Sequence, residues 1–274
     1  MKKCLVIVFA AAVLVAAPLC AQDTNPDRVT VSWSDPSRPG LLKINLLNGA
    51  ITVKTHSGPD VIIQSKGGTN RRDSAPAESG GLRRIDQNAS GLSVEEQNNV
   101  MSIGSSVFNR GANLDIEVPM KTNLNLHTVN GGDINVDGVE GEIEANNTNG
   151  SVYLNNVAGS VVAHALNGKL IVSLRQVTAN KAMSFTSMNG TVDVTFPANT
   201  KFNLKMRTDN GEIYSDFDIQ LRPSDTKPTV EDTRRQGGRY RIQIDKSMSG
   251  VINGGGPEFD LRTFNGNVYI RKGK

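Results

Sequence analysis

An Asn-Gly dipeptide recurs along this chain at a nearly constant spacing, and it constrains the fold more than any other feature. The steps at Asn130, Asn149, Asn167 and Asn189 lie 19, 18 and 22 residues apart. A period near twenty, with one turn signal in each unit, is typical of repeats that stack into a solenoid. The expected turns are Asn48-Gly49, Asn130-Gly131, Asn149-Gly150, Asn167-Gly168, Asn189-Gly190, Asn210-Gly211 and Asn265-Gly266.

The residues around these steps share one apolar frame. The positions six and four before each Asn are apolar in every unit. The positions three and five after it are apolar in nearly all units, shifted by one where Gly132 is inserted. Apolar residues at every second position on both sides of a turn indicate two half-buried strands. A further step, Asn253-Gly254, lacks the frame because Ser247 and Ser249 stand in its leading positions.

We therefore expect an all-β fold, a parallel β-solenoid or β-helix-like stack with coils of about twenty residues. In each coil a strand leads to the Asn-Gly turn, where both residues tolerate a positive φ, and a second short strand follows. One coil is expected to stack on the next through parallel ladders. The asparagines would form a ladder along one edge, with their amides bonded to each other or to adjacent backbone.

The N-terminus has the pattern of a secretory signal peptide. A basic head at residues 1–3 precedes an unbroken apolar run at residues 4–17, and residues 1–21 form the expected leader. An uncleaved membrane anchor is the first alternative, but the run is short for a span, which needs about 20 apolar residues. A lipoprotein modified at Cys20 is the second, and Leu19 is larger than the residue such a site normally has before its cysteine.

Cleavage would remove the only two cysteines, Cys4 and Cys20, so the mature chain would have no disulfide and no thiolate metal site. It would also remove Lys2 and Lys3, leaving 28 basic residues against 27 acidic ones. A net charge this small does not favour a nucleic-acid partner. The mature protein is expected to lack a membrane span.

Residues 28–274 are expected to form a single β-solenoid domain with polar insertions near residues 64–81 and 222–239. These insertions have no apolar periodicity, which is typical of loops. They contain the candidate partner-binding residues Arg71, Arg72, Arg234 and Arg235, although nearby acidic residues also fit a mixed solvated surface. Trp33, the only tryptophan, is expected to cover the open end of the core.

Two ordered motifs resemble a known family. Leu-x-Ile-x-x-x-Asn-Gly-x-Ile-x-Val begins at Leu42, and Ile116-Glu117-Val118-Pro119 leads into the regular coils. Together they are similar to the bacterial β-strand-repeat domain of unknown function usually labelled "putative adhesin", over most of residues 41–270. The resemblance implies a β-helix-like fold in an exported or envelope-facing protein. It brings no established catalytic residues.

Residue types that could support chemistry are scattered over the frame. A glycan-cleaving enzyme would need carboxylates and basic groups gathered on one surface. The candidates stand at alternating exterior positions, where solvated charge is ordinary: Asp133, Glu142, Glu144, Asp193 and Glu212, with Lys169 and Arg207. His127 and His164 share one frame position but are too few for a zinc site. Residues 131–138 resemble one calcium-binding unit, and no tandem copy follows.

These observations favour a non-enzymatic, extracytoplasmic binding or scaffold protein of adhesin-like type, which uses an extended β-solenoid surface. The expected partner is an envelope protein or a surface glycan, in the periplasm or at the cell surface. We expect no catalytic, cofactor-binding or metal-binding residues and no cofactor. The alternatives are a glycan-cleaving β-helix enzyme and an envelope-stress sensor that binds a regulator.

Overall fold

The computed structural model of the chain describes residues 28–67, 92–105, 112–222, 229–232, 240–243 and 247–273. Within these ranges the chain forms strands and turns and no helix, so the expected all-β class is confirmed. The expected leader and the candidate residues Arg71, Arg72, Arg234 and Arg235 lie outside the described ranges.

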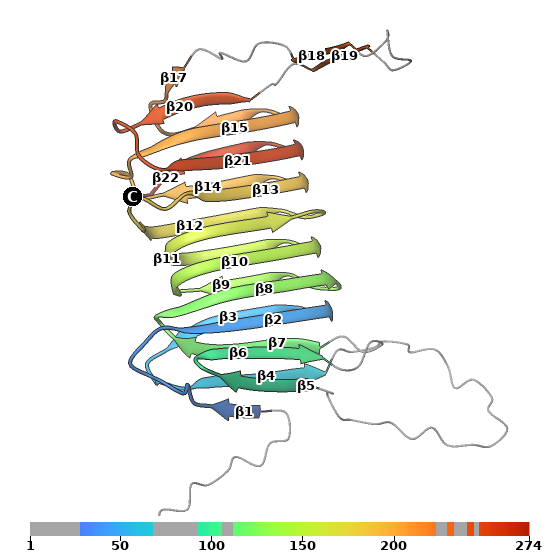
Figure 1. The fold of residues 1–274 in the computed structure, drawn as a ribbon, viewed down its shortest axis with the longest axis vertical. Coiled ribbons are helices and arrows are strands. Elements are labelled where there is room, and N and C mark those ends of the chain that lie inside the picture. Colours follow the sequence, from blue (N-terminus) through green and yellow to red (C-terminus); the bar gives the residue numbers. More distant parts are fainter. Residues whose placement is uncertain are drawn as a thin grey trace, which may run out of the picture.

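Each of the seven Asn-Gly steps joins a leading strand, before or at the Asn, to a trailing strand after the Gly (Figure 1). The leading strands are β2 (Gly40–Asn48), β8 (Thr122–Asn130), β10 (Glu140–Asn149), β11 (Val152–Ala165), β13 (Met183–Asn189), β15 (Phe202–Asn210) and β21 (Glu258–Asn265). The trailing strands are β3 (Ile51–His56), β9 (Ile134–Asp137), β12 (Leu170–Val177), β14 (Val192–Phe196), β16 (Ile213–Ser215) and β22 (Val268–Lys272). The long strand β11 serves twice, because its first half trails Asn149 and its second half leads to Asn167.

The remaining strands lie outside the repeat frame. They are β1 (Arg28–Val31), β4 (Val61–Gly67), β5 (Leu92–Gln97), β6 (Val100–Ser105), β7 (Ala112–Pro119), β17 (Gln220–Arg222) and β20 (Met248–Ile252). A separate two-stranded sheet consists of β18 (Thr229–Asp232) and β19 (Tyr240–Gln243). Two expected loops therefore contain strand: β4 extends to Gly67, and β18 lies within the second insertion. In both cases antiparallel pairing supplies the backbone hydrogen bonds that apolar periodicity did not indicate.

Successive coils pair in parallel through the middle of the stack. Leu124 of β8 is opposite Ile143 of β10, which is opposite Val161 of β11. The trailing strands pair in the same way, with Ile134 opposite Val152 and Val152 opposite Leu170. Equivalent frame positions thus lie above one another, so that each apolar side chain is covered by its counterparts in the neighbouring coils.

The order of the coils departs from the order of the sequence at both ends. The last coil, β21 and β22, lies between two earlier coils: β21 pairs with β13 on one side and β15 on the other, and β22 pairs with β14 and β16. At the opposite end, β6 and β7 lie outside β2 and β3, which precede them. The expectation that each coil stacks on the next is wrong here, because every coil has the same apolar frame and adjacency in sequence does not decide its neighbour.

Antiparallel strands cover both outer strands at one end of the parallel stack and the leading strand at the other. At one end β4 pairs antiparallel with β7, and β5 pairs antiparallel with β6. At the other end β20 pairs antiparallel with β15, and β17 pairs with β20. These strands take up the backbone groups that an uncovered terminal coil would present as a sheet edge.

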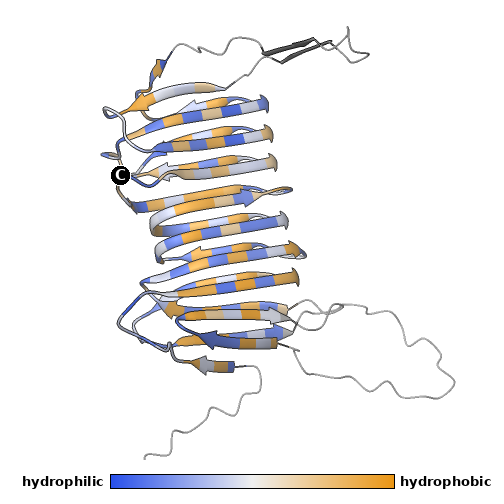
Figure 2. Cartoon of the chain, viewed as in Figure 1, coloured by the Kyte–Doolittle hydropathy of each residue, from blue (hydrophilic) through white to orange (hydrophobic). Residues whose placement is uncertain are grey.

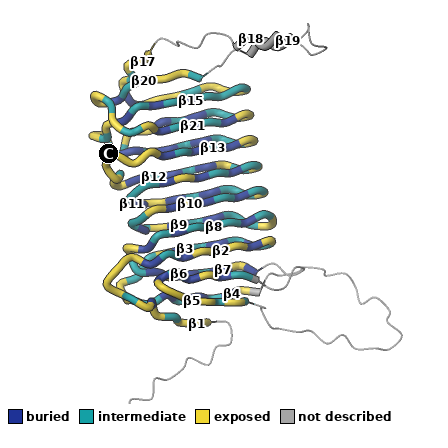
Figure 3. The backbone as a smooth tube through the Cα atoms, in the orientation of Figure 1, coloured by how far each residue is buried: buried dark blue, intermediate teal, exposed yellow. Residues whose placement is uncertain are grey.

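The apolar core runs the length of the stack, with apolar and polar residues alternating along each strand (Figures 2 and 3). All residues six and four positions before a ladder Asn are buried. The positions after the Gly are buried too, except in the Asn210 unit, where Ile213 is half-buried and Ser215 is exposed. Near that end the core is aromatic: Phe259 stacks on Phe202 with 4.6 Å between the ring centroids.

The ladder asparagines bond to one another along one edge of the stack. Each Nδ2 donates to the Oδ1 of the asparagine one coil nearer to β2: Asn149 to Asn130 (2.8 Å), Asn167 to Asn149 (3.0 Å), Asn189 to Asn167 (2.8 Å), Asn265 to Asn189 (2.7 Å) and Asn210 to Asn265 (2.8 Å). Every donor therefore points the same way, which gives the ladder a direction. Asn253 does not join it and instead donates to the backbone oxygens of Ala198 and Thr200.

The glycine in these turns is required mainly by close packing between coils. A positive φ occurs at Gly49, Gly131 and Gly266, and no ladder asparagine has one. At the other four glycines a side chain would collide with the neighbouring turn; a Cβ on Gly190, for example, would lie 2.0 Å from the oxygen of Gly168. The positive φ that both turn residues were expected to tolerate is thus adopted in three of the seven turns, each time by the glycine.

A second polar row lies inside the stack, two positions before the ladder. Thr128, Ser187, Thr208 and Thr263 donate their hydroxyl groups to the glycine carbonyl of the neighbouring turn, at 2.8–3.1 Å. Asn147 does the same with its amide, at 3.0 Å from the oxygen of Gly132. These bonds satisfy carbonyl groups that the tight turn would otherwise leave buried without a partner.

Trp33 is buried, but it lies at the side of the stack and not over its end. Its ring packs against Gly40, where a Cβ would be 2.6 Å away, and beside Pro59 and Pro119. The loop that contains it is held by Asn99, whose Nδ2 donates to the backbone oxygens of Asp35 and Arg38. Ser34 also donates to the carboxylate of Glu96, at 2.7 and 2.9 Å. The β1–β2 loop is thereby attached to the β5–β6 turn.

Acidification should loosen this attachment. The hydrogen bond from the Ser34 hydroxyl, with smaller contributions from backbone amides, holds the pKa of Glu96 below its ordinary value of 4.5. Because the folded-state pKa is the lower one, the stabilisation is present above the unfolded pKa and is lost as pH falls through the folded value. The amide resonances of Ser34 and Asn99 in an NMR titration should move with this ionisation, and Glu96→Gln should remove the movement. If the Ser34 and Asn99 amide shifts of the parent protein stayed constant while Glu96 is protonated, the proposed attachment through Glu96 would be contradicted.

Candidate functional site

The candidate carboxylates each have a local partner, and only Glu142 and Glu144 share an outward face of one strand, β10. Asp133 accepts a hydrogen bond from the backbone of Ser151 at 2.7 Å, where it fixes a turn. Glu142 forms an ion pair with Lys181. Glu144 accepts amide hydrogen bonds from Asn125 and Asn146 at 2.9 and 3.1 Å.

The other two candidates also have local partners. Asp193 is bound by Arg271, and Glu212 accepts the hydroxyl of Tyr214. Of the two candidate basic residues, Arg207 pairs with Asp209, and Lys169 lies exposed beside an Asn-Gly turn. Each of the five candidate carboxylates is thus held by a hydrogen bond or an ion pair within the fold.

The histidines do not form a pair either. His127 and His164 are both register neighbours of Asn146, which lies between them, and His164 bonds to Thr186 at 2.7 Å. His56 fixes its own turn through the backbone of Gly58. Over the described ranges no three His, Cys, Asp or Glu side chains are grouped as metal ligands, the calcium-like run at residues 131–138 included.

A groove follows the edge opposite the Asn ladder, where the trailing strand of one coil leads to the next coil. It consists of three adjoining hollows with volumes of about 570, 280 and 140 Å³. The first two share Gln176, Val177 and Thr178, and the last two share Pro39 and Lys121. Because neighbouring hollows share their walls, they form one path along the stack. We call it the connecting-edge groove.

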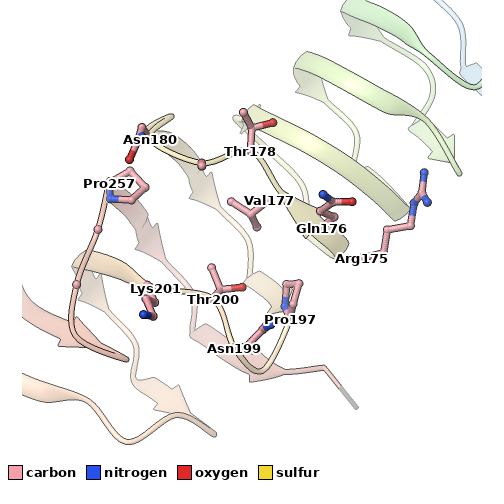
Figure 4. A pocket seen from close by; sticks show the side chains of 13 residues that line it. Arg175, Gln176, Val177, Thr178, Asn180, Pro197, Asn199, Thr200, Lys201 and Pro257 are labelled. Carbon is pink, nitrogen blue, oxygen red and sulfur yellow. The ribbon is translucent and has the colours of Figure 1, made fainter.

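The largest hollow is formed by three connecting segments (Figure 4). They are residues 175–180 at the end of β12 and just beyond it, residues 197–201 after β14, and residues 255–257 before β21. The out-of-order stacking creates this hollow, because the segment before β21 lies beside segments that come much earlier in the chain. Asn180 adopts a left-handed conformation with φ of 60°, which turns the chain out from β12.

Hydrogen bonds hold the walls of this hollow in place. The backbone of Thr200 donates to the oxygen of Pro197 at 3.0 Å and closes a turn. Asn253 bonds to the same turn from the neighbouring segment, at 2.8 Å to the oxygen of Thr200. Asn203 donates to the oxygen of Gly256 at 2.5 Å. The groove is therefore formed by a fixed backbone, which lowers the entropic cost of binding.

The two larger hollows have many polar groups in their lining, the smallest is lined mainly by Trp33 and prolines, and cations outnumber carboxylates along the groove. Hydroxyl and amide groups come from Gln176, Thr178, Asn180, Asn199 and Thr200. On the walls, Arg175 pairs with Glu140 at 3.4 Å, and Glu142 pairs with Lys181.

Two further cations, Lys121 and Lys201, are exposed and have no acidic partner among the described residues. A surface of this composition can donate and accept hydrogen bonds along a chain of hydroxyl groups. Both carboxylates in its described lining, Glu140 and Glu142, are paired with cations.

A comparison with protein families decides what kind of chain this is. The family model described as Toastrack DUF4097 matches residues 51–253, well over half of the sequence. The chain belongs to the Toastrack DUF4097 family. The resemblance drawn from the repeat motifs, to a bacterial β-strand-repeat domain of unknown function, is thereby confirmed. No curated protein was found to match.

Two solved structures are distantly similar to this Toastrack chain. A "putative cell adhesion protein" from Clostridium sporogenes ATCC 15579 has 12% sequence identity and a TM-score of 0.39, over 90% of this chain and 99% of that one. A "putative adhesin" from Bacteroides fragilis NCTC 9343 has 13% identity and a TM-score of 0.28, over 89% of this chain and 96% of that one. In the described part of the Toastrack chain, no helix has the length and apolar character needed to cross a membrane.

The sequence frame could not reveal the connecting-edge groove of this Toastrack chain. Its residues lie in the segments between coils, where length and composition vary and no periodicity applies. One signal was available: residues 178–180 and 197–201 combine Thr, Asn and Pro between two framed units. Such residues form turns, and turns that recur along one edge of a stack can together line a surface.

Proposed function

We propose that this protein is a non-enzymatic binding or scaffold protein of the cell envelope, and that the connecting-edge groove binds an extended glycan strand. The supporting observation is a row of three adjoining hollows along one edge of a β-solenoid stack, with hydroxyl, amide and charged groups in the two larger hollows and Trp33 with several prolines in the smallest. At a strand spacing of about 4.8 Å, the path from β2 to β21 is on the order of 20 Å long. A polymer fits such a path better than a small molecule does.

The chemistry of the lining selects among polymers. Hydroxyl and amide groups recur in the two larger hollows, and the two cations without acidic partners, Lys121 and Lys201, lie apart. Nucleic acid would need a dense basic surface to offset the charge of its phosphates. An apolar peptide would need a groove with few polar groups. A glycan strand instead presents hydroxyl groups at regular intervals, which match this lining.

An envelope location follows from the expected leader. Residues 1–21 combine a basic head with an apolar run, and this is typical of export. The mature chain should begin at Gln22, and so lack Cys20 and any lipid on it, when the protein is recovered from outside the cytoplasm and its intact mass is measured. A mass that includes residues 1–21, or a lipid, would contradict export with cleavage.

The test of the groove uses two exposed asparagines. Asn199 lines the largest hollow, and Asn155 lies outside all three hollows. Asn199→Trp should obstruct the groove and lower affinity for the bound polysaccharide about tenfold or more, whereas Asn155→Trp should leave it unchanged. Affinities would be measured by calorimetry, with polysaccharides selected from an array of purified bacterial envelope glycans.

Three results would contradict the proposal. The parent protein could retain no glycan from the array, which would remove the function. It could bind one with equal affinity in both variants, which would place the site elsewhere. Release of new reducing ends from a bound polysaccharide would favour the glycan-cleaving alternative.

A further inference from the structure

Three of the four tyrosines occupy one frame position, four residues after a ladder asparagine. They are Tyr153, Tyr214 and Tyr269, and all three point outward from trailing strands. Tyr269 of β22 is opposite Tyr214 of β16 on one side and Asp193 of β14 on the other. The row lies on the trailing strands, and none of its tyrosines lines the connecting-edge groove.

The two tyrosines nearest the end of the stack are held in one rigid arrangement. Their rings are 5.1 Å apart between centroids and nearly parallel, at 9°. The Arg271 guanidinium lies 5.1 Å from the centroid of Tyr269 and binds both carboxylate oxygens of Asp193, at 2.7 and 2.9 Å. Asn267 donates to the hydroxyl of Tyr269 at 3.2 Å. We call this group, together with Glu212, the tyrosine platform.

The platform ends in an aromatic surface that no strand covers. In the described part of the chain β16 pairs only with β22, so Tyr214 lies at the open edge of the trailing strands and is 45% exposed. Its hydroxyl donates to Glu212, and this hydrogen bond is the main cause of the raised pKa of Tyr214. The ring is therefore fixed by a stacking partner and a hydrogen bond while much of its surface stays in water.

Charge at the platform disfavours an anionic ligand. Arg271 is compensated by Asp193, and Glu212 has no basic partner among the described residues. Close by, the backbone N–H of Lys272 donates to Asp216, and the Lys272 ammonium lies over the ring of Phe217. The remaining carboxylate oxygen of Glu212 receives no hydrogen bond from a described residue, so it can accept one from a ligand. A ligand that donates hydroxyl groups is suited to this position.

We propose that the tyrosine platform binds a neutral pyranose residue of a glycan. The apolar C–H face of the sugar packs on the outer surface of Tyr214, because a phenol ring offers apolar area at a small cost in conformational entropy. A sugar hydroxyl donates to the open oxygen of Glu212. A uronic acid is repelled by the same carboxylate, and a phenylalanine side chain leaves that carboxylate without a donor.

The platform and the groove are both proposed to bind glycans, and the platform rests on the proposed function only through this shared class of ligand. The two sites lie on different faces, so one can bind when the other does not. A protein with both can hold a glycan at two points, and the second contact strengthens attachment when both are engaged together.

The test compares Tyr214 with Tyr153, which has the same frame position and no ring partner among the described residues. Neutral hexose and N-acetylhexosamine oligosaccharides and a uronic-acid oligosaccharide would be titrated while the tyrosine ring resonances are followed by NMR. A neutral oligosaccharide should shift the Tyr214 ring. Tyr214→Ala should lower its affinity about tenfold or more, and Tyr214→Phe and Tyr153→Ala should keep most of it.

Further variants separate this site from the groove. Glu212→Gln should weaken neutral-sugar binding, and Asn199→Trp should leave it unchanged. Loss of binding in Asn199→Trp alone would assign the sugar to the groove and overturn the platform. Equal losses in Tyr214→Ala and Tyr153→Ala, tighter binding of the uronic acid, or no shift at Tyr214 with any neutral probe would also overturn it. Thermal melting of each variant confirms that the fold is intact before binding is compared.

Discussion

Removal of residues 258–274 should unfold the last third of the stack while the coils from β2 to β12 stay folded. This segment contains β21 and β22, which lie between β13 with β14 and β15 with β16. It contributes Phe259, Leu261, Val268 and Ile270 to the core, all at most 1% exposed. Burial of four such side chains contributes roughly 6–12 kcal/mol, which is comparable to the whole stability of an ordinary domain.

Hydrogen exchange would locate the loss. Amides of residues 202–215 should exchange rapidly in the truncated protein, and those of β8 and β10 should stay protected. A synthetic peptide of residues 257–274 added in trans should restore protection, because it supplies the missing coil. Deletion of only Gly273 and Lys274 is the matched control, since β22 ends at Lys272. Unchanged protection after the longer deletion would mean that β13 and β15 can close directly on each other.

Phe185→Asp should prevent stable folding. Phe185 is 0% exposed, and its ring contacts Phe196 edge to face, with 5.9 Å between centroids. The substitution removes that packing and places a carboxylate where the described core offers no cation, so we expect a loss of roughly 4 kcal/mol or more. Val161→Asp and Ile143→Asp should behave in the same way, because both share the buried frame.

Glu144→Ala is the control from the outward face. Its side chain is exposed and accepts amide hydrogen bonds from Asn125 and Asn146, so the loss should be within about 1 kcal/mol. Glu142→Ala removes an exposed ion pair with Lys181 and should cost as little. Chemical denaturation of the purified variants measures both sets. Equal losses in the buried and exposed sets would show that the strand frame is wrong.

The local fold could be predicted from the sequence because the frame specifies which side chains point inward. Leu42, Ala163 and Phe259 are buried as their frame positions predict. The order of the coils could not be predicted, because Met183, Leu204 and Phe259 occupy the same frame position and any of them can cover another. Only the lengths of the connecting segments distinguish these choices, and the frame does not include them.

The candidate sites differ in how far the sequence could have revealed them. The tyrosine row could have been found from the sequence, because aligning the units places Tyr153, Tyr214 and Tyr269 at one outward position. The stacking of Tyr214 on Tyr269 could not have been predicted, because it depends on β22 lying beside β16. The connecting-edge groove depends on the same rearrangement, because Gly256 and Pro257 come beside Lys201 only when the last coil is inserted.

The interleaved last coil also determines when the protein can complete its fold. A chain that leaves the ribosome or crosses a membrane from its N-terminus presents β15 before β21 exists outside. In the native stack, Phe259 of β21 is opposite Met183 of β13 on one side and opposite Leu204 of β15 on the other. Before β21 is available, β13 and β15 can pair directly with each other, because Met183 and Leu204 share a frame position. The native stack then forms only after the final residues have emerged and such a contact has opened. During export the solenoid would therefore stay incompletely folded until β21 and β22 insert between the earlier coils.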